Sequence, residues 1–520
     1  MTHEDTLILP HRGDQILGHP RGLYVCFFTE MWERFSFYGM KYLLLLYLTK
    51  YHLFSDSEGL DVLGSYAGLV YAMPVIGGLL ADRYLGMRKS VVFGGILLCL
   101  GHLGMAWEGH AAYLESGERV QDAQALQVFY FSLALIIVGV GFLKPNISTI
   151  VGRLYEPGDP RRDAGFTIFY MGINIGAFIA TLLCGYLGET YGWRYGFGAA
   201  GIGMLVGLAT FLYGQDTLQG HAEPADPELL TRPIAPFLNR ERLIYLCSIA
   251  FLFVVWIMMR HIHWVEYSLN GLAAITLAAI IGYILFFCNP QERRHMTVLM
   301  VLILFSVVFW ALFEQSSASM TLFADRVVDR EIFGFTFTAS QFGSLNAFFI
   351  FTTAPLFSIL WVWLAKKGRE PSTPVKFSLG IAQVGLGFGA LVLGAGFAAD
   401  AGDVGKVAAI WLILAYFLHT TGELCLSPIG LSAVTQLSVP RVMGVMMGTW
   451  FLATAYAEFV AAQLSKLASI DTEEGQIYNI AEAVTVYGDF FESMLYIGLG
   501  AGLLLLLISP FLKRAMRDEQ

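Results

Sequence analysis

Long apolar runs constrain the fold of this chain more than any other feature. A helix needs about 20 mostly apolar residues to cross the hydrocarbon core of a bilayer. Fourteen runs meet that criterion, and polar connections such as residues 82–89, 157–163 and 366–374 separate them. The sequence therefore predicts an all-α integral membrane protein. The predicted spans are residues 22–50, 60–82, 90–108, 125–152, 164–188, 195–214, 241–259, 270–288, 296–324, 339–365, 375–398, 405–437, 441–466 and 486–512.

The composition agrees with a location in the membrane. Of the 520 residues, 56% are hydrophobic and only 14% are charged, whereas a soluble globular protein carries about 25% charged residues. The net charge of −9 provides no broad basic field, so nucleic acid is excluded as a partner. The first apolar run begins near Gly22 and is longer than the ~7–15-residue core of a signal peptide, so we interpret it as a retained span.

Motifs for catalysis and for metal binding are missing from the sequence. No GxSxG, HExxH or Walker loop occurs, and the eleven histidines are scattered. The six cysteines lie singly in apolar runs without metal-ligand spacing, and we expect them to be small buried hydrophobic residues. The chain is therefore not expected to be an enzyme or to hold a metal.

The distribution of lysine and arginine predicts the orientation. If the N-terminus is cytoplasmic, the cytoplasmic segments contain 21 of these residues and the external segments contain 8. The positive-inside rule requires a bias of this kind. We therefore expect both termini on the cytoplasmic side, and residues 215–240, with four prolines and His221, to form a solvated connector.

Charged residues inside the apolar spans carry most of the functional argument. A charge near the bilayer centre costs roughly 2.5–3.5 kcal/mol on insertion scales, so such residues face a water-filled cavity or one another. We expect a functional cluster, and a structural network of ion pairs is the alternative, which is compatible with it. The cations in question are Arg34, Lys41 and Lys144, and the acids are Glu30, Glu33, Glu314 and Glu423.

Helical geometry sorts these charges by face and by depth. At ~100° per residue, the polar residues of the first span fall in a sector of about 140°. They are Glu30, Glu33, Arg34, Tyr38 and Lys41. The predicted orientation puts Lys41 and Glu314 toward the outside, with the other charges central or inward. An outer ion pair and a central cluster of both signs suit an alternating-access carrier.

His419 lies four residues before Glu423, so both share a helix face. Two interpretations stay open at this point: the histidine modulates Glu423, or it is a hydrogen-bonded structural residue.

Several segments resemble one known family. Residues 30–39, EMWERFSFYG, resemble the ExxERFxYYG signature of the proton-coupled oligopeptide transporters, a family within the major facilitator superfamily. Three further segments agree with that family: GFLKPNIS at 141–148, FYMGINIGA at 169–177 and GELCLSPIGLS at 422–432. GGLLADRYLGMRK at 77–89 resembles the superfamily's loop motif between spans two and three.

The resemblance implies a fold and an activity. The fold is that of the major facilitator superfamily, two six-helix bundles with two extra helices between them. The implied domains are an N-terminal bundle (1–214), a cytoplasmic linker (215–240), two inserted helices (241–295) and a C-terminal bundle (296–520). The implied activity is proton-driven symport of di- and tripeptides by a monomer in the bacterial cytoplasmic membrane. Protons are the coupling ion, and no cofactor is expected.

The resemblance also implies roles for matching residues. Arg34 and Lys144 would bind the peptide carboxylate, and Glu423 would bind its α-ammonium group. Asn174 and Asn346 would hydrogen-bond the peptide backbone. Glu30 and Glu33 would couple proton binding to Arg34 and Lys144, and Lys41 with Glu314 would form the extracellular gate. The pocket would be lined by Tyr38, Tyr71, Tyr170, Trp310, Phe313, Ser427 and Trp450.

Three positions depart from the family pattern, and two other functions stay open. Gly64 stands where some members have a histidine, so we expect no histidine proton step. Lys41 replaces a frequent arginine and so loses bidentate geometry, and Phe37 replaces the first tyrosine of YYG. The alternatives are transport of another small anion or zwitterion such as nitrate, and a peptide sensor that does not transport.

Overall fold

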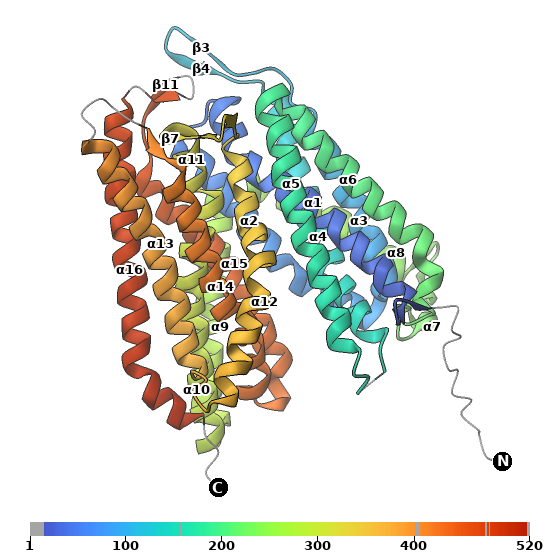
Figure 1. The fold of residues 1–520 in the computed structure, drawn as a ribbon. Helices are drawn as coiled ribbons and strands as arrows, with labels where there is room; N and C mark the ends of the chain where they lie inside the picture. The colour runs from blue at the N-terminus through green and yellow to red at the C-terminus, as the bar shows by residue number, and fades with distance from the viewer. Residues whose placement is uncertain (1–14, 157, 401–405, 474–475, 478, 517–520) are drawn as a thin grey trace, which may run out of the picture.

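The computed structural model describes residues 15–156, 158–400, 406–473, 476–477 and 479–516, and it is a bundle of long helices (Figure 1). Twelve helices in this part of the chain are long and apolar enough to cross a membrane. Two more pack among them: α1, which has charges along its length, and α3, which has Arg88 and Lys89 in its first turn. The predicted all-α membrane fold is thereby confirmed.

The long helices match the predicted spans, mostly to within a few residues. α9 starts earlier than the predicted 270, because the polar His263 and Glu266 lower the apolarity of its first turns without ending the helix. The helices are α1 Arg21–Lys50, α2 Asp56–Leu80, α3 Met87–Met105, α4 Ala123–Arg153, α5 Arg162–Tyr191, α6 Trp193–Gly214, α8 Arg240–Arg260, α9 Ile262–Phe287, α10 Pro290–Phe313, α12 Ser344–Lys366, α13 Thr373–Asp400, α14 Ala409–Leu437, α15 Met443–Ser465 and α16 Ile480–Ala515.

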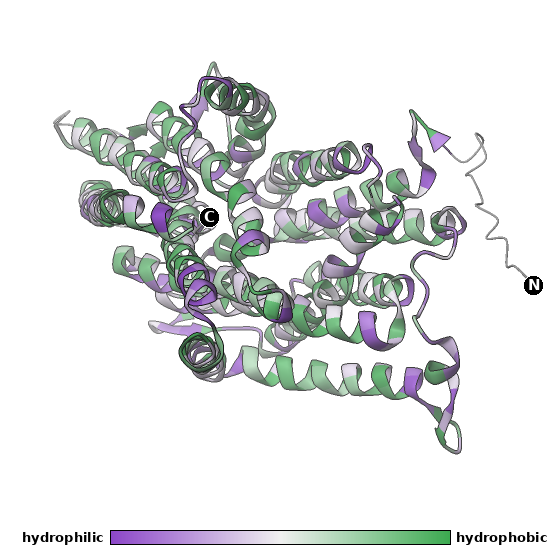
Figure 2. Ribbon diagram, turned by 90° about the horizontal axis from the view of Figure 1, so that it is seen from below, coloured by the Kyte–Doolittle hydropathy of each residue, from purple (hydrophilic) through white to green (hydrophobic). Residues whose placement is uncertain are grey.

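The helices form two packed halves. α1–α6 pack with one another, and α10 packs with α13–α16, while α8 lies against α4 and α9 lies against α2 and α15. The halves meet through α2 with α15 and through α5 with α12. In Figure 1 they lie close together at the top and splay apart toward the bottom. Seen from below, the peripheral helices are coloured mostly as hydrophobic (Figure 2), as expected for surfaces in contact with lipid.

The two ends of the bundle can be told apart by one hairpin. β3 (Tyr113–Glu115) pairs with β4 (Glu118–Val120) above the helices in Figure 1. We call this the hairpin end. α1 begins at the opposite end and α16 finishes there. Two short strands, β1 Gln15–Ile16 and β2 His19–Pro20, precede α1. The others lie in connections between helices: β5 Pro233–Ala235, β6 Leu238–Asn239, β7 Val328–Asp329, β8 Glu331–Ile332, β9 Phe335–Thr336, β10 Val407–Ala408, β11 Thr472–Glu473 and β12 Gln476–Ile477.

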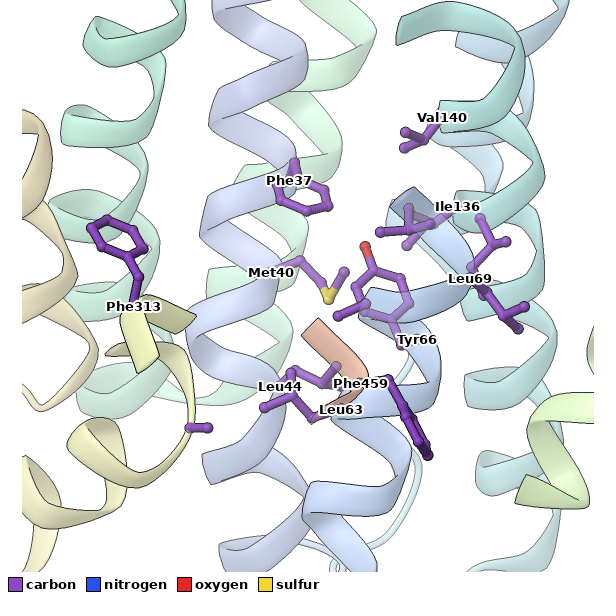
Figure 3. Packing of buried hydrophobic residues seen from close by; sticks show 14 of the residues in the cluster. Phe37, Met40, Leu44, Leu63, Tyr66, Leu69, Ile136, Val140, Phe313 and Phe459 are labelled. Carbon is purple, nitrogen blue, oxygen red and sulfur yellow. The ribbon is translucent and has the colours of Figure 1, made fainter. Parts of the chain in front are cut away.

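α1 is the central helix of the first half. The side chains of Leu43–Leu46 are fully buried, and Figure 3 shows Phe37 and Met40 of α1 facing Tyr66 of α2. This core fixes the direction in which the charged face of α1 points. The expectation that all cysteines are buried is wrong for Cys247, which is exposed. Cys247 lies on α8, a peripheral helix on which apolar side chains face outward.

Glycines allow pairs of helices to approach closely. A Cβ atom on Gly94 of α3 would lie 2.5 Å from the carbonyl oxygen of Gly139 on α4. A Cβ atom on Gly64 of α2 would lie equally close to the Cβ atom of Ala462 on α15. Small residues at crossings are typical of packed membrane helices. The second crossing brings α15 of one half against α2 of the other.

The ninth predicted span, 296–324, is not one continuous helix. α10 ends at Phe313, a 3₁₀ turn covers Glu314–Ser317, and α11 runs over Ser319–Arg326. The side chain of Gln315 occupies the break, where its amide donates to the backbone oxygens of Ala311 (3.2 Å) and Ala461 (2.9 Å). Because apolarity continues through the break, the composition of the run gave no sign of it.

The connector between the sixth and seventh predicted spans is ordered in the structure. It contains α7 (Pro227–Thr231) and the β5–β6 hairpin, and Leu230 is buried. The backbone N–H of Arg88 donates to the carbonyl of Ala222 at 2.9 Å, and Lys89 pairs with Glu241 at 2.7 Å. Most side chains of residues 215–240 are exposed, as expected for a solvated connector, and the contact of Arg88 with Ala222 holds this ordered segment against α3.

Ion pairs join the two halves at the hairpin end. The guanidinium of Arg326 donates to both carboxylate oxygens of Asp56 at 2.6 Å, and to the hydroxyl of Tyr487 at 3.1 Å. Lys50 pairs with Asp325 at 2.5 Å, and Lys466 pairs with Asp61. The Arg326–Asp56 pair is buried, so its two charges depend on each other for compensation.

We predict that Arg326→Met destabilises the folded protein by about 3–5 kcal/mol, because it leaves the Asp56 carboxylate buried without a cation. The double variant Asp56→Leu, Arg326→Met should recover most of that loss, since neither charge remains. Thermal unfolding in detergent measures both effects.

Lys466→Met is the matched control. Its side chain and that of Asp61 are 25% and 27% exposed, so we expect a change of about 0–1 kcal/mol. Equal losses for Arg326→Met and Lys466→Met would contradict the assigned importance of the buried pair.

Candidate functional site

One buried cluster of charges lies on α1. The Arg34 guanidinium donates to both carboxylate oxygens of Glu33, with 2.5 Å from Nη2 to Oε1, and Nε of Arg34 is 3.5 Å from Oε1 of Glu30. All three side chains are buried. The ring of Phe37 lies under the guanidinium, 4.6 Å from centroid to Cζ. The predicted charged face of α1 is therefore inside the bundle, where water does not screen its charges.

Lys144 of α4 belongs to the same region. Its Nζ atom lies 4.3 Å from the ring centroid of Tyr71 on α2. Its electrostatic neighbours include Arg34, Glu33 and Glu30. The cluster thus contains two acids and two bases, so its formal charge is balanced when all four are ionised.

Glu30 and Glu33 are held differently within this cluster. Both carboxylate oxygens of Glu33 accept hydrogen bonds from the Arg34 guanidinium. Oε2 of Glu30 is buried and has no hydrogen-bond partner among the described residues. A buried oxygen without a partner is better tolerated on a protonated carboxyl group than on a carboxylate. Glu30 is therefore the better placed of the two to hold a proton.

A carboxylate of the other half faces this region. The Asn346 amide on α12 donates to Glu423 on α14 at 3.0 Å and to the Thr420 hydroxyl at 3.1 Å. Tyr38 and Tyr170, from α1 and α5, are electrostatic neighbours of Glu423. The interior therefore has cations on the first half and a carboxylate on the second.

Lys41 joins the halves through two carboxylates. Its Nζ atom is 2.9 Å from Glu314, and 2.8 and 3.0 Å from the two carboxylate oxygens of Glu458. The Lys41 and Glu458 side chains are only 2% and 3% exposed, and that of Glu314 is 13% exposed. The structure thus brings together Lys41 and Glu314, which the sequence analysis paired.

The sequence analysis missed Glu458. It lies in the middle of α15, inside the apolar segment ATAYAEFVAAQ. The signal was the same as for Glu314 and Glu423, a carboxylate inside a membrane span. It should have been included among the intramembrane acids.

The remaining predicted pocket residues are less closely associated. Tyr170 is 46% exposed, and the Asn174 amide donates to the backbone oxygen of Tyr170 at 3.1 Å. Trp310 and Phe313 meet edge to face, with ring centroids 5.3 Å apart. Ser427 is half-buried.

Trp450 is buried beside Phe377 of α13 and Gly430 of α14. Within the described residues, no hydrogen bond or ion pair links Ser427 or Trp450 to the charged groups. Their predicted place in the pocket therefore stays a prediction.

His419 does not contact Glu423. Its Nε2 atom lies 3.1 Å from the carbonyl oxygen of Val384, and its ring packs at 4.7 Å from that of Phe388. This environment supports the structural interpretation of His419. Across the described ranges, no group of three or more His, Cys, Asp or Glu side chains is arranged to hold a metal ion.

Comparisons with known proteins agree on one family. The model of the POT family matches residues 88–481. The chain is 37% identical over 471 residues to the peptide transporter YePEPT of Yersinia enterocolitica, covering 86% of this chain and 88% of that protein. It is 34% identical over 504 residues to dipeptide and tripeptide permease A of Erwinia pyrifoliae, covering 96% of each. The crystal structure of a mutant of peptide transporter POT in complex with alafosfalin matches with a TM-score of 0.79 and 35% identity, covering 97% of each chain.

Proposed function

Since the chain belongs to the POT family, we propose that it transports di- and tripeptides by proton-driven symport and alternating access across the bacterial cytoplasmic membrane. The observation that carries this proposal is the separation of charge in the interior. Arg34 and Lys144 lie on the first half, and Glu423 lies on the second. A zwitterionic peptide has opposite charges at its two termini and matches that arrangement.

The proposed binding mode uses only groups that all short peptides share. Arg34 and Lys144 bind the carboxylate, Glu423 binds the α-ammonium group, and the Asn174 and Asn346 amides hydrogen-bond the backbone. The Asn346 amide already donates a hydrogen bond to Glu423. When the α-ammonium group of a peptide binds Glu423, it replaces that hydrogen bond. Termini and backbone do not depend on side-chain identity, so such a site accepts many sequences. The other residues proposed to line the pocket are Tyr38, Tyr71, Tyr170, Trp310, Phe313, Ser427 and Trp450.

Proton coupling follows from the central cluster. Peptide carboxylate and glutamate carboxylates compete for Arg34 and Lys144. A proton on Glu30 neutralises one competitor and frees cationic charge for the peptide. Glu33 keeps Arg34 oriented through its bidentate pair. Protons are thus the coupling ion, and we propose that the chain works as a monomer without a cofactor and without enzymatic activity.

The proposed orientation puts both termini in the cytoplasm, on the basis of 21 cytoplasmic against 8 external basic residues. The hairpin end is then extracellular. Lys41 and Glu314 act as the extracellular gate there, together with the Arg326–Asp56 and Lys50–Asp325 pairs. In this conformation the carrier is closed to the outside.

Uptake of labelled dialanine into proteoliposomes tests the function. We expect accumulation that requires an imposed proton gradient, with competition by other dipeptides and none by nitrate. Competition by nitrate would favour the anion-transporter alternative. Binding without gradient-driven accumulation would favour a sensor.

We predict that Glu423→Gln weakens binding of peptides with a free α-amino group about 10–100-fold, because a hydrogen bond to a charged group contributes about 1.5–3 kcal/mol. N-acetylated peptides, which lack the ammonium charge, should lose little. Competition assays with both peptide types measure the difference, and Glu492→Gln, at a half-buried position of α16 where the acid accepts from Tyr496, is the control. Equal losses for both types would argue against the ammonium role.

We predict that Glu30→Gln abolishes gradient-driven accumulation and preserves counterflow, the exchange of labelled for unlabelled peptide. Glutamine imitates the protonated carboxyl group, so substrate binding continues while proton release at this position is lost. Both assays use the same proteoliposomes. Full uphill uptake by Glu30→Gln would remove Glu30 from the coupling scheme.

A further inference from the structure

The tip of the β5–β6 hairpin carries two exposed apolar side chains. Phe237 and Ile234, on the two sides of the turn, have 93% and 51% of their surface exposed. All of residues 231–237 are exposed, so no other part of the chain covers this tip. A phenylalanine or isoleucine side chain in water lacks the favourable free energy that its burial would provide. The tip is therefore an apolar surface without a partner in this chain.

The fold holds Phe237 in its outward position. The φ angle of this residue is +66°, a left-handed conformation that is unfavourable for a bulky side chain. The guanidinium of Arg242 donates to the carbonyl oxygen of Phe237 at 2.7 Å, and β5 pairs with β6 around the turn. The hairpin thus presents the ring to its surroundings in a fixed direction.

The hairpin lies close to the level at which α8 enters the membrane. Asn239, the last residue of β6, caps α8 and accepts from the backbone N–H of Arg242 at 2.8 Å. Leu243, one turn into α8, is exposed on this peripheral helix. Two extended and four helical steps separate Phe237 from Leu243, which is at most ~13 Å of chain. Since the headgroup layer is about 5–8 Å thick on each side of the hydrocarbon core, the tip is within reach of lipid.

Cations stand beside the apolar tip. Arg232, which precedes β5, and Arg242 are both exposed. Arg240 is half-buried and donates to the carbonyl oxygen of Leu229 at 3.0 Å. None of the three arginines pairs with a carboxylate within the residues that the structure describes. Their charges are therefore available to a ligand.

The nearby acids do not neutralise these charges. Glu223 and Glu241 pair with the arginine and the lysine in the first turn of α3. Asp226 caps α7 by accepting from a backbone N–H at 2.8 Å, and Glu228 is exposed. Three arginines against these last two acids leave the segment 226–242 with a net positive charge.

The combination fits a phospholipid with a negative headgroup. Apolar side chains with basic residues beside them are typical of segments that lie in the interface of a bilayer. Basic residues next to a membrane helix favour anionic lipids. The planar guanidinium group matches the geometry of a phosphate, and Arg242 uses only one of its nitrogen atoms on Phe237.

We propose that the β5–β6 hairpin is a membrane anchor that binds anionic phospholipid. Ile234 and Phe237 enter the apolar edge of the bilayer, and Arg232 and Arg242 bind lipid phosphate groups. The anchor fixes the depth at which α8 begins. Because the first turn of α8 also pairs with Lys89, it holds the start of α3 at the same surface. This inference does not depend on what the protein transports.

Fluorescence quenching in nanodiscs tests the depth of the hairpin in the full chain. Ala235→Cys provides a labelling site between Ile234 and Phe237 and leaves both side chains in place. It is combined with Cys247→Ser, because Cys247 is exposed and the other five cysteines are buried. A fluorophore at position 235 should be quenched by phospholipid with a nitroxide high on its acyl chain and shielded from iodide in the water. A fluorophore on Ser116→Cys, at the exposed turn between β3 and β4, should show the reverse.

Phe237→Ser tests the apolar contact with the same label at position 235. We expect most of the lipid quenching to be lost and the iodide quenching to rise several-fold, because the serine side chain favours water. Phe333→Ser is the matched control, since Phe333 is 98% exposed on a different hairpin, and it should change neither signal.

Two results would overturn the anchor. In the first, iodide reaches the label at position 235 as well as it reaches the label at position 116. In the second, the label is shielded from iodide but is not quenched by the nitroxide lipid, which means that the tip lies against another protein molecule.

The charge preference is tested with the nitroxide on phosphatidylglycerol or on phosphatidylcholine at the same lipid fraction. Phosphatidylglycerol should quench more strongly, and Arg232→Gln should reduce its local enrichment about fivefold, the contribution of one basic residue near a charged surface. The double variant with Arg242→Gln should reduce it further. Arg369→Gln, which removes an exposed arginine between α12 and α13, should leave it unchanged. Equal quenching by the two lipids in the wild type would overturn the binding of anionic lipid.

Discussion

The contact of Lys41 with Glu314 and Glu458 is the interaction on which the arrangement of the halves depends. Three features of the fold converge on it. α1 is held in place by its own apolar face, the break after Phe313 turns Glu314 out of helical register, and the crossing at Gly64 brings α15 close to α2. The side chains of Lys41 and Glu458 are buried at this contact, and that of Glu314 is nearly so. Their mutual compensation is what allows charge at this depth.

The separation of charge between the halves follows from the same constraint. Buried charges need partners, and within the first half Arg34 and Lys144 find them in Glu30 and Glu33. Glu423 of the second half is held by the Asn346 amide, a neutral donor. Its carboxyl group therefore has no cationic partner of its own and can pair with a cation that enters the interior. A ligand with both an ammonium and a carboxylate group provides a partner for the charged groups of each half. A simple anion provides a partner only for the cations of the first half.

The sequence predicted those features that depend on local composition. Apolar runs located the spans because each run has to match the thickness of a bilayer, and the charges within runs pointed to the central cluster and to the Lys41–Glu314 pair. The break at Glu314 was missed because hydropathy does not change there, and the hydrogen bonds that satisfy it come from Gln315 and the distant Ala461. The ordered connector likewise depends on contacts with α3 that no local pattern encodes. Glu458 differs from these, since its signal was present and was overlooked.

Ion pairs are suited to holding a carrier closed because they stabilise the closed form only slightly relative to the open form. An apolar seal gains free energy in proportion to the area it buries, and opening it exposes that area to water. Burying an ion pair removes the hydration shells of both charges, and the attraction between them only roughly offsets the lost hydration free energy. The closed and open forms then differ little in free energy. A small change in the interactions of Lys41 with Glu314 and Glu458 is then enough to change which form is favoured, and a carrier that must visit both forms in each cycle requires that balance.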